Sequence, residues 1–117
     1  MSKNVFGEPL QPCCNSPITG FYRDGFCKTD EYDRGSHSVC VIITQDFLEF
    51  SKNRGNDLST PRPEYEFPGL VPGDKWCLVA VRWQEALEAG VAPKLELNAT
   101  NELALEYLDL ADLISHS

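Results

Sequence analysis

The chain has 117 residues, of which 42% are apolar and 24% charged, a composition typical of one folded domain spanning residues 1–117 and not of a disordered chain. Its 18 acidic and 10 basic residues give a net charge of −8, which repels phosphate backbones and argues against nucleic-acid binding. No apolar run reaches the roughly 18 residues that a membrane span needs, and residues 1–12 lack the apolar stretch of a secretory signal. We therefore expect a cytoplasmic protein that does not enter membranes.

The first 37 residues are rich in Gly, Pro, Asp and Asn, which favour tight turns between short extended pieces. Phe21 and Tyr22, next to Asp24-Gly25, suggest one arm of a hairpin. The β-branched run SVCVIIT over residues 38–44 then predicts a buried strand.

A helix is predicted directly after this strand, over QDFLEFSKNR. Thr44 is placed to accept a hydrogen bond from a free amide at its start, and Asp46 lies in its first turn. Gly55 suits the left-handed residue that commonly ends a helix.

The next segment, RGNDLSTPRPEYEFPGLVPGDKW over residues 54–76, has no clear hydrophobic period. Loops of this length are uncommon in compact domains unless they are functional or disordered. Its four prolines restrict the unfolded chain and favour a stiff loop. A stiff loop suits a pre-organised ligand site, and it equally suits a cover over a sheet edge.

The rest of the chain is predicted to alternate between short strands and short helices. The expected elements are a buried strand at 76–81, a helix at 82–90, a half-exposed strand at 93–99 and a helix at 110–116 capped by Asp109. Residues 101–108 are ambiguous between helix and strand, and we favour a turn leading into a short strand near 105–108. These elements predict an α+β protein, a two-layer α/β sandwich with a small mixed sheet, short helices and long irregular loops. A parallel pairing of the two buried strands is allowed, and the strand order stays open.

Five cysteines stand at positions 13, 14, 27, 40 and 77. Their odd number in a reducing compartment argues against a disulfide scaffold. Cys40 and Cys77 lie in the two most apolar strands, so simple packing is the first interpretation. A functional role for these two would require them to lie side by side in the sheet or to open onto a pocket.

Two chemical alternatives exist for the remaining thiols. Cys13, Cys27, His37 and Cys40 offer zinc ligands, but only the last two have a typical ligand spacing, so we predict neither metal nor cofactor. Cys27, flanked by Arg23 and Lys28, is a candidate redox thiol. His37 is interpreted either as a loop residue bonded to backbone or as a proton shuttle beside Cys27 or Cys40.

Several motifs taken together resemble a known bacterial family. The chain is similar to domain of unknown function 2237 in the motifs NVFGEPLQPC, TGFYRDG, RGNDLSTPRPEY and the later FPGL, PGD and WCL. The resemblance runs from about Asn4 to the C-terminal helix. It implies a small single-domain two-layer α/β fold and carries no assigned activity. Relatives often have a second thiol at the position of Val79, which puts Cys-x-Cys chemistry in doubt for this chain.

The leading functional hypothesis is a binding site for a small polar or anionic ligand, built from the central loop and nearby cysteines, where rigid scaffolds usually present functional groups. Its candidate residues are Arg23, Asp24, Cys27, His37, Arg54, Asn56, Asp57, Ser59, Arg62, Cys77 and Arg82. The alternative is a non-catalytic structural domain or a domain that binds a protein partner, in which Arg54, Arg62 and Arg82 pair internally with Asp57, Asp74, Glu64 or Glu66. Trp76 and Trp83 are core residues, or else walls for a flat ligand or a guanidinium. Catalysis and oligomeric state are left open.

Overall fold

The computed structural model describes residues 2–14, 19–20, 22–29, 36–65 and 67–117. Phe21, on which the predicted hairpin rests, and Glu66, a predicted arginine partner, lie outside these residues. The elements, in chain order, are β1 (Val39–Ile42), α1 (Gln45–Asn53), η1 (Pro63–Tyr65), β2 (Lys75–Leu78), α2 (Ala80–Glu88), β3 (Lys94–Leu95), η2 (Leu97–Ala99), η3 (Glu102–Glu106) and α3 (Leu110–Ser115), where η marks a 3₁₀ helix.

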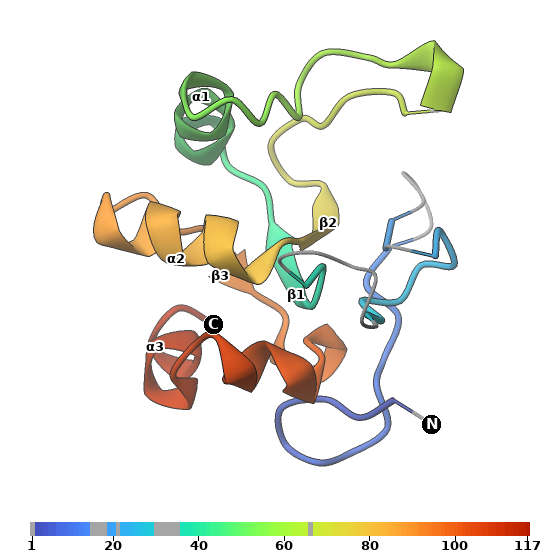
Figure 1. The fold of residues 1–117 in the computed structure, drawn as a ribbon, viewed down its shortest axis with the longest axis vertical. Coiled ribbons are helices and arrows are strands. Elements are labelled where there is room, and N and C mark those ends of the chain that lie inside the picture. Colours follow the sequence, from blue (N-terminus) through green and yellow to red (C-terminus); the bar gives the residue numbers. More distant parts are fainter. Residues whose placement is uncertain (1, 15–18, 21, 30–35, 66) are drawn as a thin grey trace.

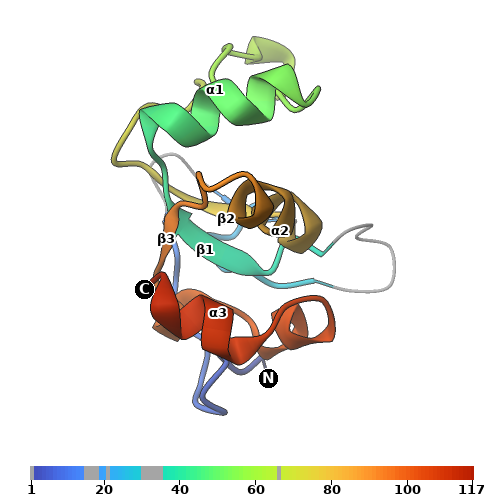
Figure 2. The same cartoon turned by 90° about the vertical axis from the view of Figure 1, so that its left-hand side faces the viewer.

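The three strands form one sheet in the order β2-β1-β3. The predicted α+β class is confirmed, but the sheet is antiparallel throughout and not mixed. The reason is the long loop after α1, which brings the chain back along β1 in the opposite direction. Figure 1 shows the three α-helices to the left of β1 and β2 and the N-terminal segment to the right, and Figure 2 shows α2 lying across the sheet.

The sheet separates two buried clusters because successive side chains of a strand point to opposite faces. Val39, Val41 and Leu78 belong to the larger cluster, with Phe47 and Trp83 from the helices. The smaller cluster, on the other face, consists of Cys13, Cys27, Cys40, Cys77 and Ala99. The N-terminal segment is therefore held to the sheet through sulfur-bearing side chains.

Helix α1 confirms the predicted start and end signals. The Phe47 amide donates to the Thr44 hydroxyl at 3.1 Å, so Thr44 satisfies one of the free amides of the first turn. Gly55 has a φ of +87°, the left-handed conformation expected just after the helix.

Helix α2 begins at Ala80, two residues earlier than predicted, so the preceding strand is shorter. Ala80, Trp83 and Ala86 are its buried residues, and their spacing of three is helical. The uninterrupted apolar run conceals the boundary, because a buried strand and the buried face of a helix are both apolar.

The C-terminal region differs most from the prediction. The short strand expected near residues 105–108 is wrong, since residues 102–106 form the 3₁₀ helix η3. The Asn101 side chain accepts from the Leu103 amide at 2.9 Å and donates to the Cys27 carbonyl at 3.0 Å, which fixes the start of η3. Helix α3 follows Asp109 as predicted, but the Asp109 side chain forms no capping hydrogen bond. None of the helices in the described part of the chain has the length and apolarity to cross a membrane.

Candidate functional site

The loop between α1 and β2 is folded back on itself. The Arg62 amide donates to the Phe67 carbonyl at 2.7 Å, and the Phe67 amide donates to the Arg62 carbonyl at 3.1 Å. Further in, the Leu70 amide donates to the Leu58 carbonyl at 2.8 Å. The loop is thus a two-limbed structure with η1 at its tip, visible at the upper right of Figure 1. The stiffness expected from its prolines stays a prediction.

Asp57 shapes the first limb. Its carboxylate accepts from the Thr60 hydroxyl at 2.6 Å, the Ser59 amide at 3.0 Å, the Ser59 hydroxyl at 3.0 Å and the Thr60 amide at 3.2 Å. These hydrogen bonds, that of the Thr60 hydroxyl first and that of the Ser59 amide next, hold the pKa of the Asp57 carboxyl far below its usual range. Asp57 is therefore ionised at neutral pH, and Ser59 serves the shape of the loop.

At Gly69 the second limb lies against the backbone of the first. It has a φ of +81°, and a Cβ there would lie 2.5 Å from the Ser59 carbonyl oxygen. Gly55 has a similar φ of +87°, but a Cβ there would meet nothing within 4 Å. Comparing an alanine at Gly69 with an alanine at Gly55 therefore separates the free-energy cost of a left-handed backbone from that of a steric clash.

We expect Gly69→Ala to destabilise the protein by about 3 kcal/mol, because strain and clash act together, and Gly55→Ala by about 1 kcal/mol, because only the strain applies. Urea unfolding of both variants measures the difference. Equal destabilisation by the two substitutions would mean that the limbs do not pack as described.

A hollow of about 230 Å³ lies beside this loop. The lining residues in the described part of the chain come from three separate segments, and they are Arg23, Asp57, Leu58, Arg62, Phe67 and Trp76. The rings of Phe67 and Trp76 are tilted against each other with centroids 5.3 Å apart. The Arg23 guanidinium carbon lies 5.7 Å from the centroid of the Trp76 ring, within range of a cation–π interaction.

The N-terminal segment brings Arg23 to Trp76 through a tight turn. The Arg23 amide donates to the Gly20 carbonyl at 3.0 Å, and Arg23 itself has a φ of +55°. Thr19 anchors the turn to β2, since its hydroxyl accepts from the Cys77 amide at 2.8 Å. A non-glycine residue in the left-handed region costs free energy and is often associated with function. This turn places a guanidinium against the residue that precedes Cys77.

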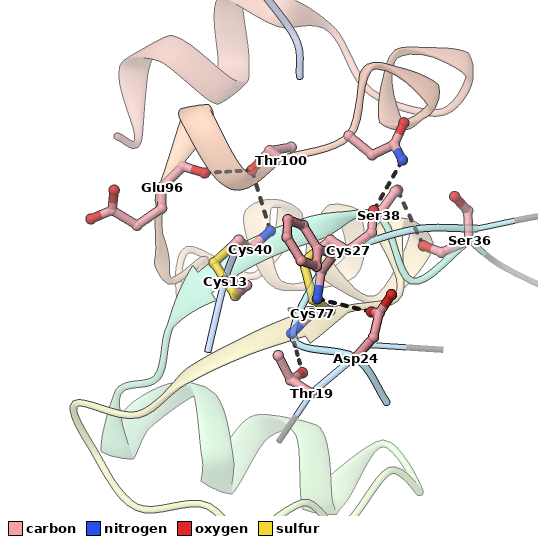
Figure 3. The surroundings of a disulfide bond; sticks show 12 residues. Cys13, Thr19, Asp24, Cys27, Ser36, Ser38, Cys40, Cys77, Glu96 and Thr100 are labelled. Atoms are coloured by element: carbon pink, nitrogen blue, oxygen red, sulfur yellow. Dashed lines mark hydrogen bonds between the residues drawn. A yellow bond between two sulfur atoms is a disulfide. The ribbon is translucent and has the colours of Figure 1, made fainter. Parts of the chain in front are cut away.

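Four of the five cysteines form two buried disulfides, Cys13–Cys40 and Cys27–Cys77 (Figure 3). The prediction of no disulfide scaffold is therefore wrong. An odd number of cysteines excludes only that all of them form disulfides, and Cys14 is the cysteine left free. Cys40 and Cys77 do lie side by side, as direct partners in the register of β1 and β2. Cys27 and Cys77 were expected in the ligand site, but they instead tie the Arg23 turn to β2.

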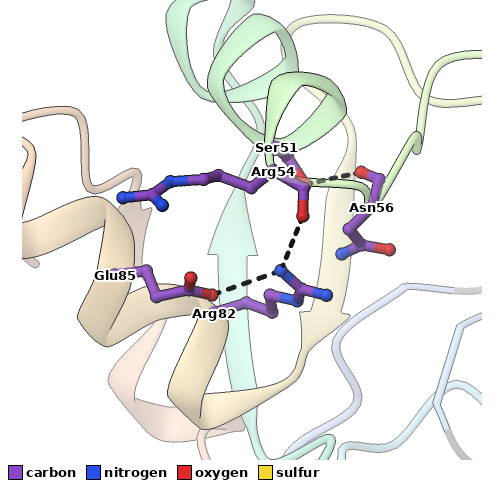
Figure 4. A network of polar contacts seen from close by, with 5 residues as sticks. All are labelled: Ser51, Arg54, Asn56, Arg82 and Glu85. Atoms are coloured by element: carbon purple, nitrogen blue, oxygen red, sulfur yellow. Dashed lines mark hydrogen bonds and ion pairs between the residues drawn. The ribbon is translucent and has the colours of Figure 1, made fainter.

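Arg54, Asn56 and Arg82 are not among the described residues that line the hollow, so this part of the predicted site does not converge with the rest. Figure 4 shows these three residues together where the end of α1 faces α2. The Arg54 guanidinium carbon lies 5.3 Å from the Phe50 ring centroid, because the side chain folds back along α1. Arg82 donates to the Arg54 carbonyl at 3.2 Å and pairs with Glu85 at 3.3 Å. The Asn56 carbonyl accepts from the Ser51 hydroxyl at 2.6 Å. These contacts join the end of α1 to α2 and to the loop.

Asp24 and His37 also lie outside the hollow's described lining. Asp24 accepts from the Phe26 amide at 3.1 Å and pairs with Lys28 at 3.2 Å, so it stabilises a turn. His37 is half-buried just before β1. Of the eleven predicted residues, the structure brings together Arg23, Asp57 and Arg62 in the hollow.

The apolar part of the lining was missed except for Trp76, for which a wall was one of two interpretations. Leu58 and Phe67 are large apolar residues in an otherwise polar loop, a signal that marks contact between the limbs or with the sheet. The sequence does not distinguish that contact from the wall of a hollow.

Comparison with known proteins gives a family but no activity. No curated protein matches the chain. A family model described as "uncharacterized protein conserved in bacteria (DUF2237)" matches residues 3–117, nearly the whole chain, and thereby confirms the resemblance noted from the motifs. The chain therefore belongs to this bacterial family.

Proposed function

We propose that the hollow binds a small anionic ligand with a flat apolar body. The observation that carries the proposal is the Arg23 guanidinium over the Trp76 ring, with Arg62 in the same hollow. Guanidinium groups bind carboxylates and phosphates through paired hydrogen bonds. Aromatic and aliphatic walls provide the area that a flat ring needs. The proposed ligand is still small and anionic, as predicted, but the proposed site now includes only the residues around the hollow.

The size of the hollow limits the ligand. Sites for drug-sized molecules typically enclose about 300–1,000 Å³, whereas this hollow has about 230 Å³. A single-ring carboxylate or phosphate monoester is the matching size class. With a net charge of −8, the protein as a whole does not attract anions, so the two arginines must provide the local attraction.

Binding is proposed here, and no reaction. A general base works best with a pKa near the operating pH, and the pKa of Asp57 is held far below that range. Its carboxylate is also occupied by the amides and hydroxyls of Ser59 and Thr60. Asp57 therefore suits a role in shaping the loop that borders the site.

A thermal-shift comparison tests the proposal. Benzoate and phenyl phosphate are expected to raise the melting temperature of the protein, whereas benzamide, which has the same ring without the charge, is not. Arg62→Gln is expected to weaken binding of the anions by about 10- to 100-fold, because hydrogen bonds to charged groups contribute about 1.5–3 kcal/mol. Isothermal titration measures this loss.

Arg54→Gln is the matched control, since it removes the same charge outside the hollow. It should leave the affinity within about twofold of the original. Equal weakening by the two substitutions would point to a general charge effect. A failure of every single-ring anion to bind would overturn the proposal.

The competing function is that of a protein-interaction domain. The observation in its favour is the exposure of large apolar side chains in and around η3 and α3, namely Leu103, Leu105, Tyr107, Leu110 and Ile114. A partner bound there would be displaced by Ile114→Glu and unaffected by Arg62→Gln. The opposite response would favour the hollow.

A cytoplasmic location stays a prediction. Buried disulfides are typical of oxidising compartments, so Cys13–Cys40 and Cys27–Cys77 weigh against it. Whether these four sulfurs are disulfides or thiols in the cell would therefore indicate the redox environment in which the protein is located.

A further inference from the structure

Four sulfur atoms from distant parts of the chain meet behind the sheet. Cys40 and Cys77 face each other across β1 and β2, while Cys13 and Cys27 come from the N-terminal segment. The Sγ atoms of Cys13, Cys27 and Cys77 all lie within 4.8 Å of one another, and Cys40 is bonded to Cys13. All four residues are at most 7% exposed. Figure 3 shows the two disulfides next to each other.

This arrangement is close to what a tetrahedral metal ion requires. Zinc binds four thiolates at about 2.3 Å, which separates the sulfurs by roughly 3.8 Å. Reduction breaks both sulfur–sulfur bonds and allows each bonded pair to separate toward that value. Of the four remaining pairs, Cys13–Cys27 and Cys13–Cys77 are already within 4.8 Å, and reduction frees the Cys40 side chain to move toward the sulfurs of Cys27 and Cys77. We propose that the reduced protein binds one Zn²⁺ through Cys13, Cys27, Cys40 and Cys77.

The disulfide and zinc states exclude each other. Each disulfide takes two electrons and two protons from a dithiol reductant, which becomes a disulfide itself, so two equivalents produce four thiols. Zinc binds thiolates, so its entry releases the four thiol protons to solvent. A two-electron oxidant for each cysteine pair reverses the process and expels the ion. A reducing compartment would then favour the zinc form, and an oxidising one the disulfide form.

The ligand set differs from the one considered from sequence spacing. Cys77 takes the place of His37, because the antiparallel register puts Cys77 directly opposite Cys40. The expectation of no metal rested on ligand spacing, because only His37 and Cys40 have a typical one. The register of the sheet instead supplies Cys40 and Cys77 as neighbouring ligands that are distant in sequence.

Cobalt titration of the reduced full-length chain tests the site. Co²⁺ in a tetrahedral thiolate site gives intense visible absorption and sulfur-to-metal charge transfer. The expected result is saturation at one Co²⁺ per chain and displacement by one Zn²⁺. The oxidised chain should give neither band. A reduced chain that yields no tetrahedral cobalt spectrum would overturn the proposal.

Two variants define the ligands. Cys14→Ser should retain the full cobalt spectrum, and Cys77→Ser should lose the four-thiolate spectrum. Because Cys77→Ser also changes the core, alkylation of the reduced wild-type chain provides a test without substitution. With Zn²⁺ bound, iodoacetamide should modify Cys14 alone; with a chelator and denaturant it should modify all five cysteines. Equal labelling of the native chain with Zn²⁺ and with chelator would contradict the proposal.

Discussion

Replacing Cys27 and Cys77 together with alanine should lower the free energy of unfolding of the oxidised protein by about 4 kcal/mol. The bond closes a loop across 50 residues, and the chain-entropy account of such a loop gives this magnitude. The loss should also weaken ligand binding, because the bond ties the Arg23 turn to the strand that carries Trp76. Urea unfolding without reductant measures the first effect.

Cys14→Ala is the control for this change. Cys14 is half-buried and forms no disulfide, so its replacement should alter the free energy of unfolding by at most about 0.5 kcal/mol. A loss of less than 1 kcal/mol in the double variant, similar to that of Cys14→Ala, would mean that the Cys27–Cys77 bond does not form in the oxidised protein.

Trp83→Ala should lower the free energy of unfolding by about 4 kcal/mol, the typical range for a buried aromatic residue. Trp83 is fully buried, and its indole N–H donates to the Pro93 carbonyl at 3.0 Å. Its ring also packs nearly perpendicular to the His116 ring, with centroids 5.5 Å apart. The substitution removes the centre of the larger buried cluster and leaves the Pro93 carbonyl without this donor.

Two variants separate these contributions. Trp83→Phe retains most of the apolar ring and should cost about 1–2 kcal/mol, chiefly through the lost hydrogen bond and some lost volume. Val81→Ala, on the same helix but 43% exposed, should cost about 0.5 kcal/mol or less. A small effect of Trp83→Ala in chemical unfolding would contradict the placement of Trp83 in the core.

Local signals in the sequence predicted the parts of the fold that depend on local physics. Thr44 and Gly55 bracket α1 because a capping hydroxyl and a left-handed glycine act within one turn of the helix. The prolines of the long loop predict stiffness, and the loop folds back on itself through backbone hydrogen bonds. The apolar run around Val79 does not indicate where α2 starts. A buried strand and the buried face of a helix are both apolar, so their different periods cannot be distinguished over such a run. Residues 102–106 were mistaken for part of a turn and strand because Asn101 fixes them through contacts distant in sequence.

The candidate site was predictable only in part, for the same reason. Arg23 and Arg62 were chosen for their chemistry, but their meeting beside Trp76 depends on how the N-terminal turn is anchored to β2. The two disulfides depend on the antiparallel register that pairs Cys40 with Cys77, and no spacing in the sequence reveals that register. Arg54 and Arg82 have the same chemistry but face a different part of the molecule.

The central claim is that Arg23, Arg62 and Trp76 form one anion site, and the two tryptophans allow a direct test. In a ¹⁵N-labelled protein, titration with phenyl phosphate should shift the Trp76 indole signal in a saturable way. The Trp83 signal should stay in place, because Trp83 is fully buried and is not part of the hollow's lining. Trp83→Phe assigns the two signals. If the Trp76 signal does not move, or if both signals move together, the account of the site is wrong.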